Sequence, residues 1–242
     1  MCGIIAAASN RNVGKLLVQG LHKMEYRGYD SAGIALHQSN QIAHLRTLGK
    51  VKLLEEKMIA EKPKSKLGIA HTRWATHGVP SEENAHPHMS NDRVYIVHNG
   101  IIENYLDLKE FLKKEGYSFS SETDSELIAH MLEYFLNKDN SMLDSMYLTK
   151  EKLEGAYAIA AIDRENEHNI TIARSKSPLL IGIGIDEFLA ASDPLAIGQL
   201  TNEFIFLEDG DVAEISSESY TIYDDSKKQV EREISNIDIS SQ

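Results

Sequence analysis

The sequence predicts an α+β protein in which helices and strands pack as layers. Segments typical of strands and of helices come in clusters rather than in strict alternation, which argues against a doubly wound parallel sheet. From residue 156 onward, short strand-like segments follow one another between turn signals. The chain has 242 residues, of which 42% are hydrophobic. That is enough for one large core and marginal for two.

The N-terminal part of the chain predicts strands separated by two helices. The apolar run at 3–8 is typical of a buried strand. Residues 13–24 form an amphipathic helical pattern, with Leu17, Leu21 and Met24 on one face and Asn12 as a candidate cap. We expect further strands at 33–37 and 67–70, a charged helix at 51–61, and a long polar stretch at 71–93.

The middle of the chain predicts helices, and its last third predicts strands. Residues 94–98 form a strand pattern that ends at Asn99-Gly100, a dipeptide favoured in tight turns. A helix over 104–114 would bury Leu108 and Leu112. The pattern Thr123-x-x-Glu126 is a capping box that would open a helix running to about residue 135. We expect another helix at 141–153 and strands at 156–162, 170–174, 179–185, 188–191, 204–207 and 211–215.

The composition disfavours several classes of partner. A net charge of −12 is unfavourable for binding nucleic acid or an anionic membrane. The longest apolar runs, such as 157–162, are far too short to span a bilayer, and no basic segment precedes the N-terminal apolar run. A single cysteine forbids an intramolecular disulfide, which fits a reducing compartment. We therefore expect a cytoplasmic protein with no nucleic-acid or membrane partner.

The only cysteine, Cys2, directly follows the initiator Met1. If Met1 is removed, Cys2 carries a thiol and an α-amine whose ordinary pKa values, roughly 8.5 and 7.7–8.0, are close enough for proton exchange. An N-terminal threonine is activated by its own amine in the same way, and a thiol ionises more easily. The alternative is an inert thiol near a frayed terminus, but the apolar run that follows would hold this terminus inside the fold. We predict that Cys2 is a nucleophile.

The dipeptide Asn99-Gly100 has two interpretations. One is a plain hairpin turn, which an isolated Asn-Gly usually forms. The other is an oxyanion hole, in which the Asn99 amide and the Gly100 backbone N–H converge on one developing negative charge. The candidate nucleophile at Cys2 favours the second interpretation.

Arg73 and Asp124 are candidates for binding the two ends of an amino acid zwitterion. A guanidinium matches a carboxylate bidentately, although a surface salt bridge is the usual role of an arginine. Asp124 lies in the first turn of a predicted helix, where a carboxylate is also favourable for local reasons. Trp74, the only tryptophan, follows a short strand. It is either a core residue or part of a mobile lid.

Five histidines between residues 71 and 98 raise the question of a zinc site, since His86-Pro87-His88 places two imidazoles close together. No cysteine lies nearby, and the spacing fits no zincin or zinc-finger pattern. The chain also has no glycine-rich phosphate cradle of either common type. We expect no metal and no cofactor.

Several of these stretches together resemble the glutaminase domain of glutamine–fructose-6-phosphate aminotransferases, also called glucosamine-6-phosphate synthases. The resemblance rests on the N-terminal Cys-Gly-Ile, on the strings Tyr-Arg-Gly-Tyr-Asp-Ser-Ala-Gly at 26–33 and His-Thr-Arg-Trp-Ala-Thr-His-Gly at 71–78, and on His-Asn-Gly at 98–100 with Ser-Glu-Thr-Asp at 121–124. It covers residues 2–215. The amidophosphoribosyltransferase branch is similar at the cysteine but typically has a His-Arg-Gly-Gln type string where this chain has residues 26–29.

This resemblance implies a four-layer αββα sandwich of two antiparallel sheets, the N-terminal-nucleophile hydrolase fold. It implies that L-glutamine is hydrolysed to L-glutamate and ammonia, with Cys2 attacking the amide carbon and Asn99 and Gly100 stabilising the oxyanion. The remaining expected roles follow the family pattern. Arg73, Thr76 and His77 would hold the substrate carboxylate, Asp124 its ammonium, Trp74 would gate ammonia, and Arg27 would lie beside the cysteine.

The chain departs from the family in length. Family enzymes continue into two sugar-isomerase domains that accept the ammonia, and the full-length form is expected to be a homodimer. We expect a glutaminase domain over 1–223, a charged tail or start of a linker over 224–242, and no sugar-isomerase domain in this chain. Two alternatives remain open, which are the same chemistry with a phosphoribosyl acceptor and a non-catalytic regulatory or metal-binding module on this fold.

Overall fold

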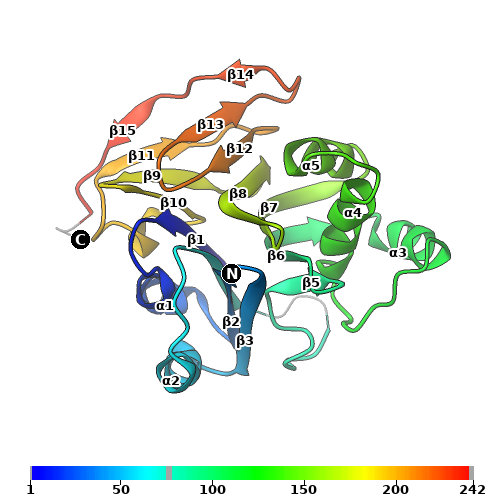
Figure 1. The fold of residues 1–242 in the computed structure, drawn as a ribbon, viewed down its shortest axis with the longest axis horizontal. Helices are drawn as coiled ribbons and strands as arrows, with labels where there is room; N and C mark the ends of the chain where they lie inside the picture. The colour runs from blue at the N-terminus through cyan, green and yellow to red at the C-terminus, as the bar shows by residue number, and fades with distance from the viewer. Residues whose placement is uncertain (1, 75–77, 240–242) are drawn as a thin grey trace.

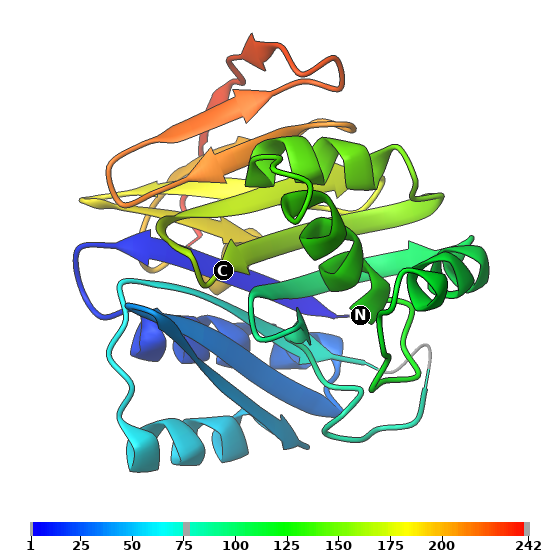
Figure 2. The ribbon, with the colours of Figure 1, turned by 45° about the vertical axis from the view of Figure 1, so that its right-hand side comes forward.

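Two antiparallel sheets stack face to face, and helices cover the outer face of each (Figure 1). The description comes from a computed structural model and covers residues 2–74 and 78–239. Helices α1 and α2 lie against the first sheet and α3–α5 against the second, and Figure 2 shows the layers from a second direction. The expected α+β class and αββα sandwich are confirmed.

The first sheet has eight strands within the described residues, in the order β15-β11-β9-β10-β1-β4-β2-β3. All its pairings are antiparallel, and β1 lies near the centre, between β4 and β10. Its strands are β1 (Gly3–Ser9), β2 (Ser31–Gln38), β3 (Gln41–Leu48), β4 (Leu67–Arg73), β9 (Leu180–Gly184), β10 (Glu187–Ala191), β11 (Glu203–Phe206) and β15 (Ile234–Asn236).

The second sheet has seven strands within the described residues, in the order β14-β13-β12-β8-β7-β6-β5. The long strands β6, β7 and β8 are neighbours in this sheet, with Val94 opposite Asp163 at one end of the β6–β7 pair. A short turn joins β7 to β8, whereas α3–α5 connect β6 to β7. Its strands are β5 (His88–Ser90), β6 (Val94–Ile102), β7 (Gly155–Asp163), β8 (Asn166–Ser175), β12 (Val212–Ile215), β13 (Tyr220–Tyr223) and β14 (Gln229–Val230).

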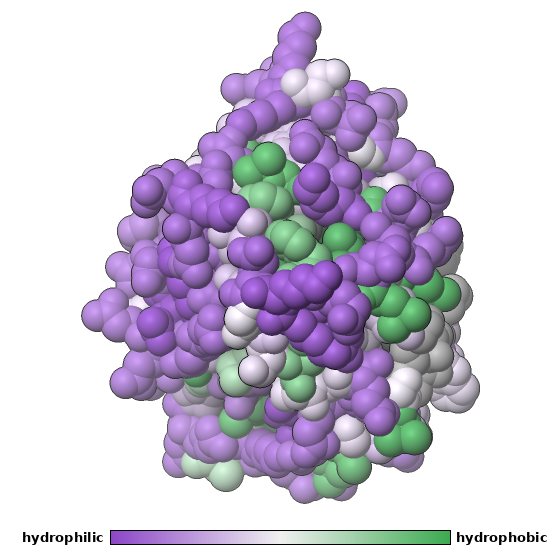
Figure 3. Space-filling model, turned by 90° about the vertical axis from the view of Figure 1, so that its right-hand side faces the viewer, coloured by the Kyte–Doolittle hydropathy of each residue, from purple (hydrophilic) through white to green (hydrophobic). Residues whose placement is uncertain are grey.

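Helices α1 and α3 are amphipathic, and their charged residues lie on the outer face. On the face that carries α3–α5, hydrophobic atoms form separated groups between hydrophilic ones (Figure 3). Within the described residues, no helix is long and apolar enough to cross a bilayer. The helices are α1 (Gly14–Met24), α2 (Val51–Glu61), α3 (Tyr105–Lys114), α4 (Glu126–Leu136) and α5 (Met142–Lys150), with short 3₁₀ turns at Glu25–Arg27 and Pro194–Ala196.

Strand alternation divides the apolar residues into three cores. In β1, Ile4, Ala6 and Ala8 face the space between the sheets, whereas Ile5 and Ala7 face α1 and α2. Both faces of β1 are therefore covered, which explains why its sequence is a continuous apolar run. The third core lies between the second sheet and α3–α5, and the expected Leu108 and Leu112 are buried in it.

The expected end of the strand at Asn99-Gly100 is wrong, because β6 runs through this dipeptide to Ile102. Asn99 pairs with Ala158 and Gly100 with Tyr157. Gly100 has φ +129°, and a Cβ there would overlap the carbonyl oxygen of Ala156. Glycine is needed at this position because the neighbouring strand approaches closely, and no turn follows from it.

Two further local expectations differ from the structure. The strand β3 was not anticipated, since half of its residues are polar and only two are buried at this edge of the sheet. The capping box does not form, because the Glu126 carboxylate accepts hydrogen bonds from the N–H groups of Ser120 and Ser121. Helix α4 starts at Glu126 itself, without a side-chain cap.

The segment after residue 223 contributes to both sheets. Strand β14 pairs with β13 of the second sheet, and β15 pairs with β11 of the first. The guanidinium of Arg232 binds the buried carboxylate of Asp211, with an Nη2–Oδ1 distance of 2.8 Å. Residues expected to be a linker therefore pack on the sandwich as far as Asn236, whereas the boundary drawn after residue 223 stays a prediction.

Candidate active site

The register of β1 and β4 places Cys2 beside Arg73. Ile4 lies opposite His71, so Cys2, two residues earlier, lies next to Arg73, two residues later. Ile4 and Ile69 belong to the core between the sheets. Because side chains alternate along a strand, Cys2, His71 and Arg73 face the same interior space at one end of the sandwich.

The thiol of Cys2 lies against the backbone of Trp74. The Trp74 N–H donates to Sγ at 3.3 Å, and the thiol lies 3.5 Å from the Trp74 carbonyl oxygen, to which it donates. Burial raises the pKa of the thiol, and the Trp74 backbone contact and the charge of Arg73 oppose this rise. At neutral pH the thiol is therefore protonated, and a base must remove its proton during any nucleophilic attack.

The side-chain amide of Asn99 reaches from the second sheet to the first. Its Nδ2 donates to the Cys2 carbonyl oxygen at 3.2 Å, and its Oδ1 lies 2.9 Å from His71 Nε2. Tyr95 and Val97 precede Asn99 at alternating positions and belong to the core between the sheets, so the strand pattern aims Asn99 at the same space as Cys2. The structure thus brings the candidate nucleophile and the candidate oxyanion donor together.

A small cavity of about 20 Å³ opens beside Cys2. This is room for about one water molecule. Five separate segments line it, through the side chains or backbone of Cys2, Arg73, Trp74, His86, His98, Gly100, Thr123 and Ser125. A larger hollow of about 990 Å³ lies at the other end of β1, around Ser9 and Lys66, and contains none of the candidate residues.

Arg73 is the last residue of β4 and is almost fully buried. Its Nη2 donates to the Gly78 carbonyl oxygen at 3.2 Å, and its Nη1 lies 3.9 Å from the Asp30 carboxylate. The guanidinium is therefore held by its surroundings while it lines the cavity. Thr76 and His77, the two residues expected to act with Arg73, lie outside the described residues.

Asp124 is buried just before α4. Its Oδ2 accepts a hydrogen bond from the Ile102 N–H at 2.8 Å, and its Oδ1 lies 3.4 Å from the Ser125 hydroxyl. The carboxylate therefore ties the segment before α4 to the end of β6, next to the cavity-lining Gly100 and Ser125.

Arg27 forms an ion pair with Asp193, with an Nη2–Oδ2 distance of 2.6 Å. The hydroxyl of Tyr26 donates to the same carboxylate oxygen at 2.6 Å. Trp74 is about half exposed, and its indole packs on Gly28, one residue after Arg27. The loop after α1 therefore contacts the Trp74 side chain, whose backbone contacts the thiol.

Four buried histidines lie around the site: His71 on the first sheet, His88 and His98 on the second, and His86 just before β5. The rings of His71 and His86 lie 4.1 Å apart, and those of His86 and His88 lie 4.5 Å apart. Burial lowers the pKa of His71 and of His88 to about 3, and His98 and His86 shift in the same direction for the same cause. These imidazoles are neutral at physiological pH, and no group of three metal-ligating side chains occurs among residues 2–74 and 78–239.

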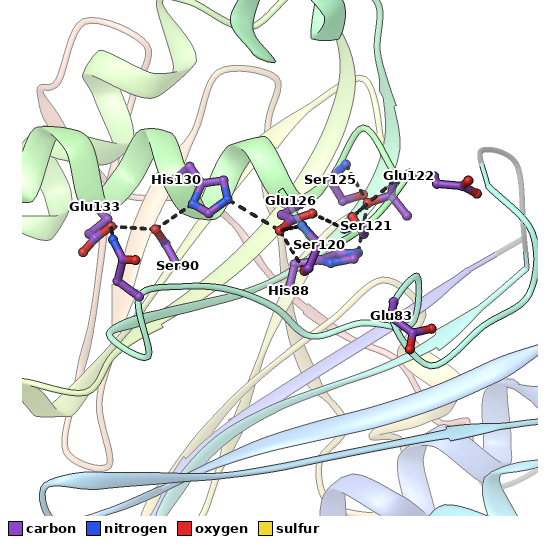
Figure 4. Close-up of polar contacts among 12 residues, drawn as sticks. Glu83, His88, Ser90, Ser120, Ser121, Glu122, Ser125, Glu126, His130 and Glu133 are labelled. Carbon is purple, nitrogen blue, oxygen red and sulfur yellow. Dashed lines mark hydrogen bonds and ion pairs between the residues drawn. The ribbon is translucent and has the colours of Figure 1, made fainter. Parts of the chain in front are cut away.

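A buried network fixes the segment that precedes Asp124 (Figure 4). The Glu126 carboxylate accepts from the N–H groups of Ser120 and Ser121, and His130 Nε2 lies 3.5 Å from it. Ser90 Oγ lies 2.7 Å from His130 Nδ1. Ser90, His130 and Glu126 are all buried and none of them lines the cavity, so this arrangement holds the segment in place.

The sequence model described as "Glutamine amidotransferase domain" matches residues 71–199, slightly more than half of the chain. The chain belongs to the glutamine amidotransferase domain family. The match includes Arg73, Asn99, Gly100 and Asp124, whereas Cys2 precedes it.

This amidotransferase domain is similar over nearly its whole length to part of a larger enzyme. It is 50% identical over 235 residues to the glutamine–fructose-6-phosphate aminotransferase (isomerizing) of Vibrio parahaemolyticus and 47% identical over 240 residues to that of Shewanella oneidensis. These matches cover 97% and 99% of the chain but only 38% and 39% of the relatives. The chain thus spans less than half the length of the curated relatives it matches, and it is a class II amidotransferase domain.

Solved structures share the fold of the amidotransferase domain. A glutamine phosphoribosylpyrophosphate amidotransferase from B. subtilis superposes with a TM-score of 0.79 at 24% identity, covering 94% of this chain and 50% of that one. A glutamine aminotransferase class-II domain protein from Silicibacter pomeroyi gives a TM-score of 0.60 at 14% identity, covering 92% and 99%. At these identities the likeness concerns the fold alone.

Sequence reasoning missed several residues of the amidotransferase site. His98, Thr123 and Ser125 line the cavity, and His71 contacts Asn99, although the histidines were weighed only as metal ligands. The alternation of side chains along a strand could have pointed to His71. It shares one face of β4 with Arg73, and Cys2 lies on the same face of the adjacent strand. The contact with Asn99 crosses between the sheets and leaves no local pattern.

Proposed function

We propose that this domain hydrolyses L-glutamine to L-glutamate and ammonia, with Cys2 as an N-terminal nucleophile. The observation that carries the proposal is the convergence of Cys2 and the Asn99 amide at one end of the sandwich, with Asn99 Nδ2 only 3.2 Å from the Cys2 carbonyl oxygen. Glutamine is the substrate of the family, and the thiol has no competing cysteine within the chain. The proposal requires that Met1 be removed.

The first step forms a thioester. The α-amine of Cys2 takes the thiol proton while Sγ bonds to the side-chain amide carbon, and the carbonyl electron pair moves to oxygen. The intermediate collapses when the α-ammonium returns a proton to the leaving nitrogen, the C–N bond breaks and ammonia departs. Because burial raises the thiol pKa, proton transfer must accompany attack, and a free thiolate does not accumulate beforehand.

The second step regenerates the thiol. The α-amine accepts a proton from water, whose oxygen attacks the thioester carbon. The C–S bond breaks, sulfur takes the proton back from the α-ammonium, and glutamate leaves after its new carboxyl group loses a proton to solvent. Each step passes through an oxyanion, which the second Nδ2 hydrogen of Asn99 and the Gly100 N–H would stabilise.

The substrate would be held by its charged end. Arg73, at the cavity wall, is suited to the α-carboxylate. Asp124 is suited to the α-ammonium, because among the described residues its Oδ1 has only a long contact with Ser125. Thr76 and His77 would add to the carboxylate site, and Trp74 would gate the exit of ammonia. Arg27 would support this gate through the loop that contacts Trp74.

In its natural setting, the ammonia would convert fructose 6-phosphate to glucosamine 6-phosphate on sugar-isomerase domains. The support is the identity of about half of all residues to aminotransferases that carry this name, over nearly the whole chain. A phosphoribosyl acceptor has weaker support, since the matching amidotransferase structure is only 24% identical. A homodimeric full-length enzyme in the cytoplasm is part of the same proposal.

The test combines mass and activity. The purified chain is analysed by intact mass before and after reaction with 6-diazo-5-oxo-L-norleucine, a glutamine mimic that alkylates nucleophilic cysteines. Chain without Met1 should gain one adduct at Cys2 and release glutamate from glutamine, and Cys2→Ala should do neither while unfolding like the wild type. Full glutaminase activity from chain that retains Met1 would show that another group is the base.

A further inference from the structure

We propose that His71 is a positioning residue, which determines which end of the Asn99 amide faces Cys2. The inference rests on the proposed function, because it assigns to His71 the construction of the oxyanion donor. His71 touches neither the thiol nor the cavity in the described structure, so its effect on the reaction would pass through Asn99.

The contact joins the two sheets at the catalytic end of the sandwich. His71 lies on β4 of the first sheet and Asn99 on β6 of the second, and the His71 Nε2–Asn99 Oδ1 distance is 2.9 Å. The same Nε2 lies 3.1 Å from the His98 carbonyl oxygen. Strand β5 begins at His88, opposite Ile96, so the part of β6 that His71 contacts lies beyond its pairing with β5.

Both partners of Nε2 are oxygen atoms, which determines the tautomer. The hydrogen must be on Nε2, because the backbone carbonyl of His98 can only accept. Asn99 therefore turns its Oδ1 toward His71 and its Nδ2 toward Cys2, where the carbonyl oxygen of Cys2 accepts one hydrogen. Rotating the amide by half a turn would direct Nδ2 at an N–H donor and Oδ1 at a carbonyl oxygen, so both hydrogen bonds would be lost.

The surroundings of His71 favour a fixed donor over a proton-transfer group. The ring is fully buried and packs on His86 at 4.1 Å, and Nδ1 has no hydrogen-bond partner within the described residues. Burial holds its pKa at about 3, with the nearby charge of Arg73 acting in the same direction. A neutral imidazole thus supplies the donor without placing a positive charge beside the thiol.

The experiment compares two substitutions at this position. His71→Gln keeps an amide N–H close to the place of Nε2, whereas His71→Leu fills similar space without a donor. We expect His71→Leu to lower kcat for glutamine hydrolysis by roughly ten- to a hundredfold, with little change in KM. This fold-change corresponds to the interaction energies typical of two residues in contact. His71→Gln should recover most of the loss.

Two further readouts separate positioning from general disruption. In an Asn99→Ala background, His71→Leu should cause almost no additional loss of kcat, because the group it orients is already absent. Alkylation of Cys2 by iodoacetamide builds no oxyanion, so its rate should be the same in wild type and His71→Leu. If His71→Leu does not fold, the pair His71→Gln and His71→Asn replaces it, since the shorter Asn cannot reach Asn99 and should be the slower enzyme.

Equal kcat for the donor and non-donor variants would overturn the inference, as would losses that simply add to those of Asn99→Ala. A parallel fall in the iodoacetamide rate would also overturn it, because the damage would then reach the thiol itself. If the wild type lacking Met1 does not hydrolyse glutamine, it is the proposed function that fails. Only results obtained with an active wild type bear on His71.

Discussion

The indole of Trp74 lies directly on the backbone of Gly28, so closely that a Cβ at Gly28 would overlap the Cε3 atom of the ring. Gly28 has φ +103°, which glycine adopts without strain. The backbone of Trp74 in turn holds the Cys2 thiol. The loop after α1 therefore controls the position of a residue that lies next to the nucleophile.

Gly28→Ala should displace the Trp74 indole. We expect its fluorescence to be quenched more strongly by acrylamide than in the wild type, because the ring loses its contact with the loop. Trp74 is the only tryptophan, so the signal reports this residue alone.

Gly116→Ala is the matched control for this variant. Gly116 also has positive φ (+93°), but a Cβ there would meet no atom within 4 Å. Positive φ should destabilise both variants. Gly28→Ala should be the less stable one, because its φ of +103° and ψ of +154° lie in a region essentially confined to glycine and its Cβ overlaps the indole. Only Gly28→Ala should alter the fluorescence. Identical quenching in both variants would show that the indole does not depend on this glycine.

Much of the fold follows from sequence patterns, whereas the strand order does not. The apolar run after Cys2 and the amphipathic patterns of α1 and α3 predicted those elements because their periodicity is local. That β1 lies between β4 and β10 depends on pairing across more than 60 residues of chain, which no local pattern encodes.

The site shows the same division. The sequence predicted the site residues Cys2, Arg73 and Asn99. It did not predict the backbone conformation at Asn99-Gly100, which tertiary contacts determine. The Asn99-Gly100 dipeptide favours a turn in isolation, and pairing with β7 holds it in a strand. The His71–Asn99 contact was not predictable, because it depends on how one sheet packs on the other.

Asn99→Ala should lower kcat for glutamine hydrolysis by roughly 10²–10³, the usual loss for one preorganised oxyanion donor. KM should change less, since the interaction strengthens only as negative charge develops in the transition state. Steady-state kinetics on protein of verified mass give both constants. An effect confined to KM would assign Asn99 to substrate binding instead.

Arg73→Ala should weaken glutamine binding. Loss of a charge-assisted hydrogen bond costs about 1.5–3 kcal/mol, so Kd should rise roughly ten- to 150-fold. The variant also removes the guanidinium that lies 3.9 Å from the Asp30 carboxylate, so stability is measured in parallel. A glutamine analogue without the α-carboxylate is the discriminating ligand, and it should lose far less affinity than glutamine. Equal losses for both ligands would make Arg73 a structural residue.

Asp124→Asn isolates the charge of this side chain from its structural contact. The asparagine Oδ1 can still accept from the Ile102 N–H, which Asp124 binds at 2.8 Å, so the fold should be retained. KM for glutamine should rise by roughly ten- to 150-fold because the α-ammonium loses its counter-charge. Asp124→Ala, which removes the Ile102 partner as well, should also lower thermal stability. Unchanged KM in Asp124→Asn would exclude Asp124 from substrate binding.

The buried histidines should make the domain lose stability in mild acid. Burial lowers the pKa of His44 to about 4 and of His71 and His88 to about 3, whereas an unfolded histidine titrates near 6.5. Above pH 6.5 these neutral histidines make their full contribution to the free energy of unfolding. As pH falls below 6.5, the unfolded chain binds protons that the folded chain does not, so the free energy of unfolding declines toward the folded pKa values.

His44→Gln tests this dependence away from the site. His44 Nε2 lies 2.9 Å from the Pro87 carbonyl oxygen, and a glutamine amide can replace that donor without titrating. Between pH 6 and 5, denaturant unfolding should show a slope that is shallower than wild type by about 1 kcal/mol per pH unit. His168→Gln, at a solvent-exposed position, is the control and should leave the slope unchanged. A slope that is the same in His44→Gln and wild type would show that His44 is already protonated in the folded chain, because only a neutral buried histidine makes folding release protons in this range.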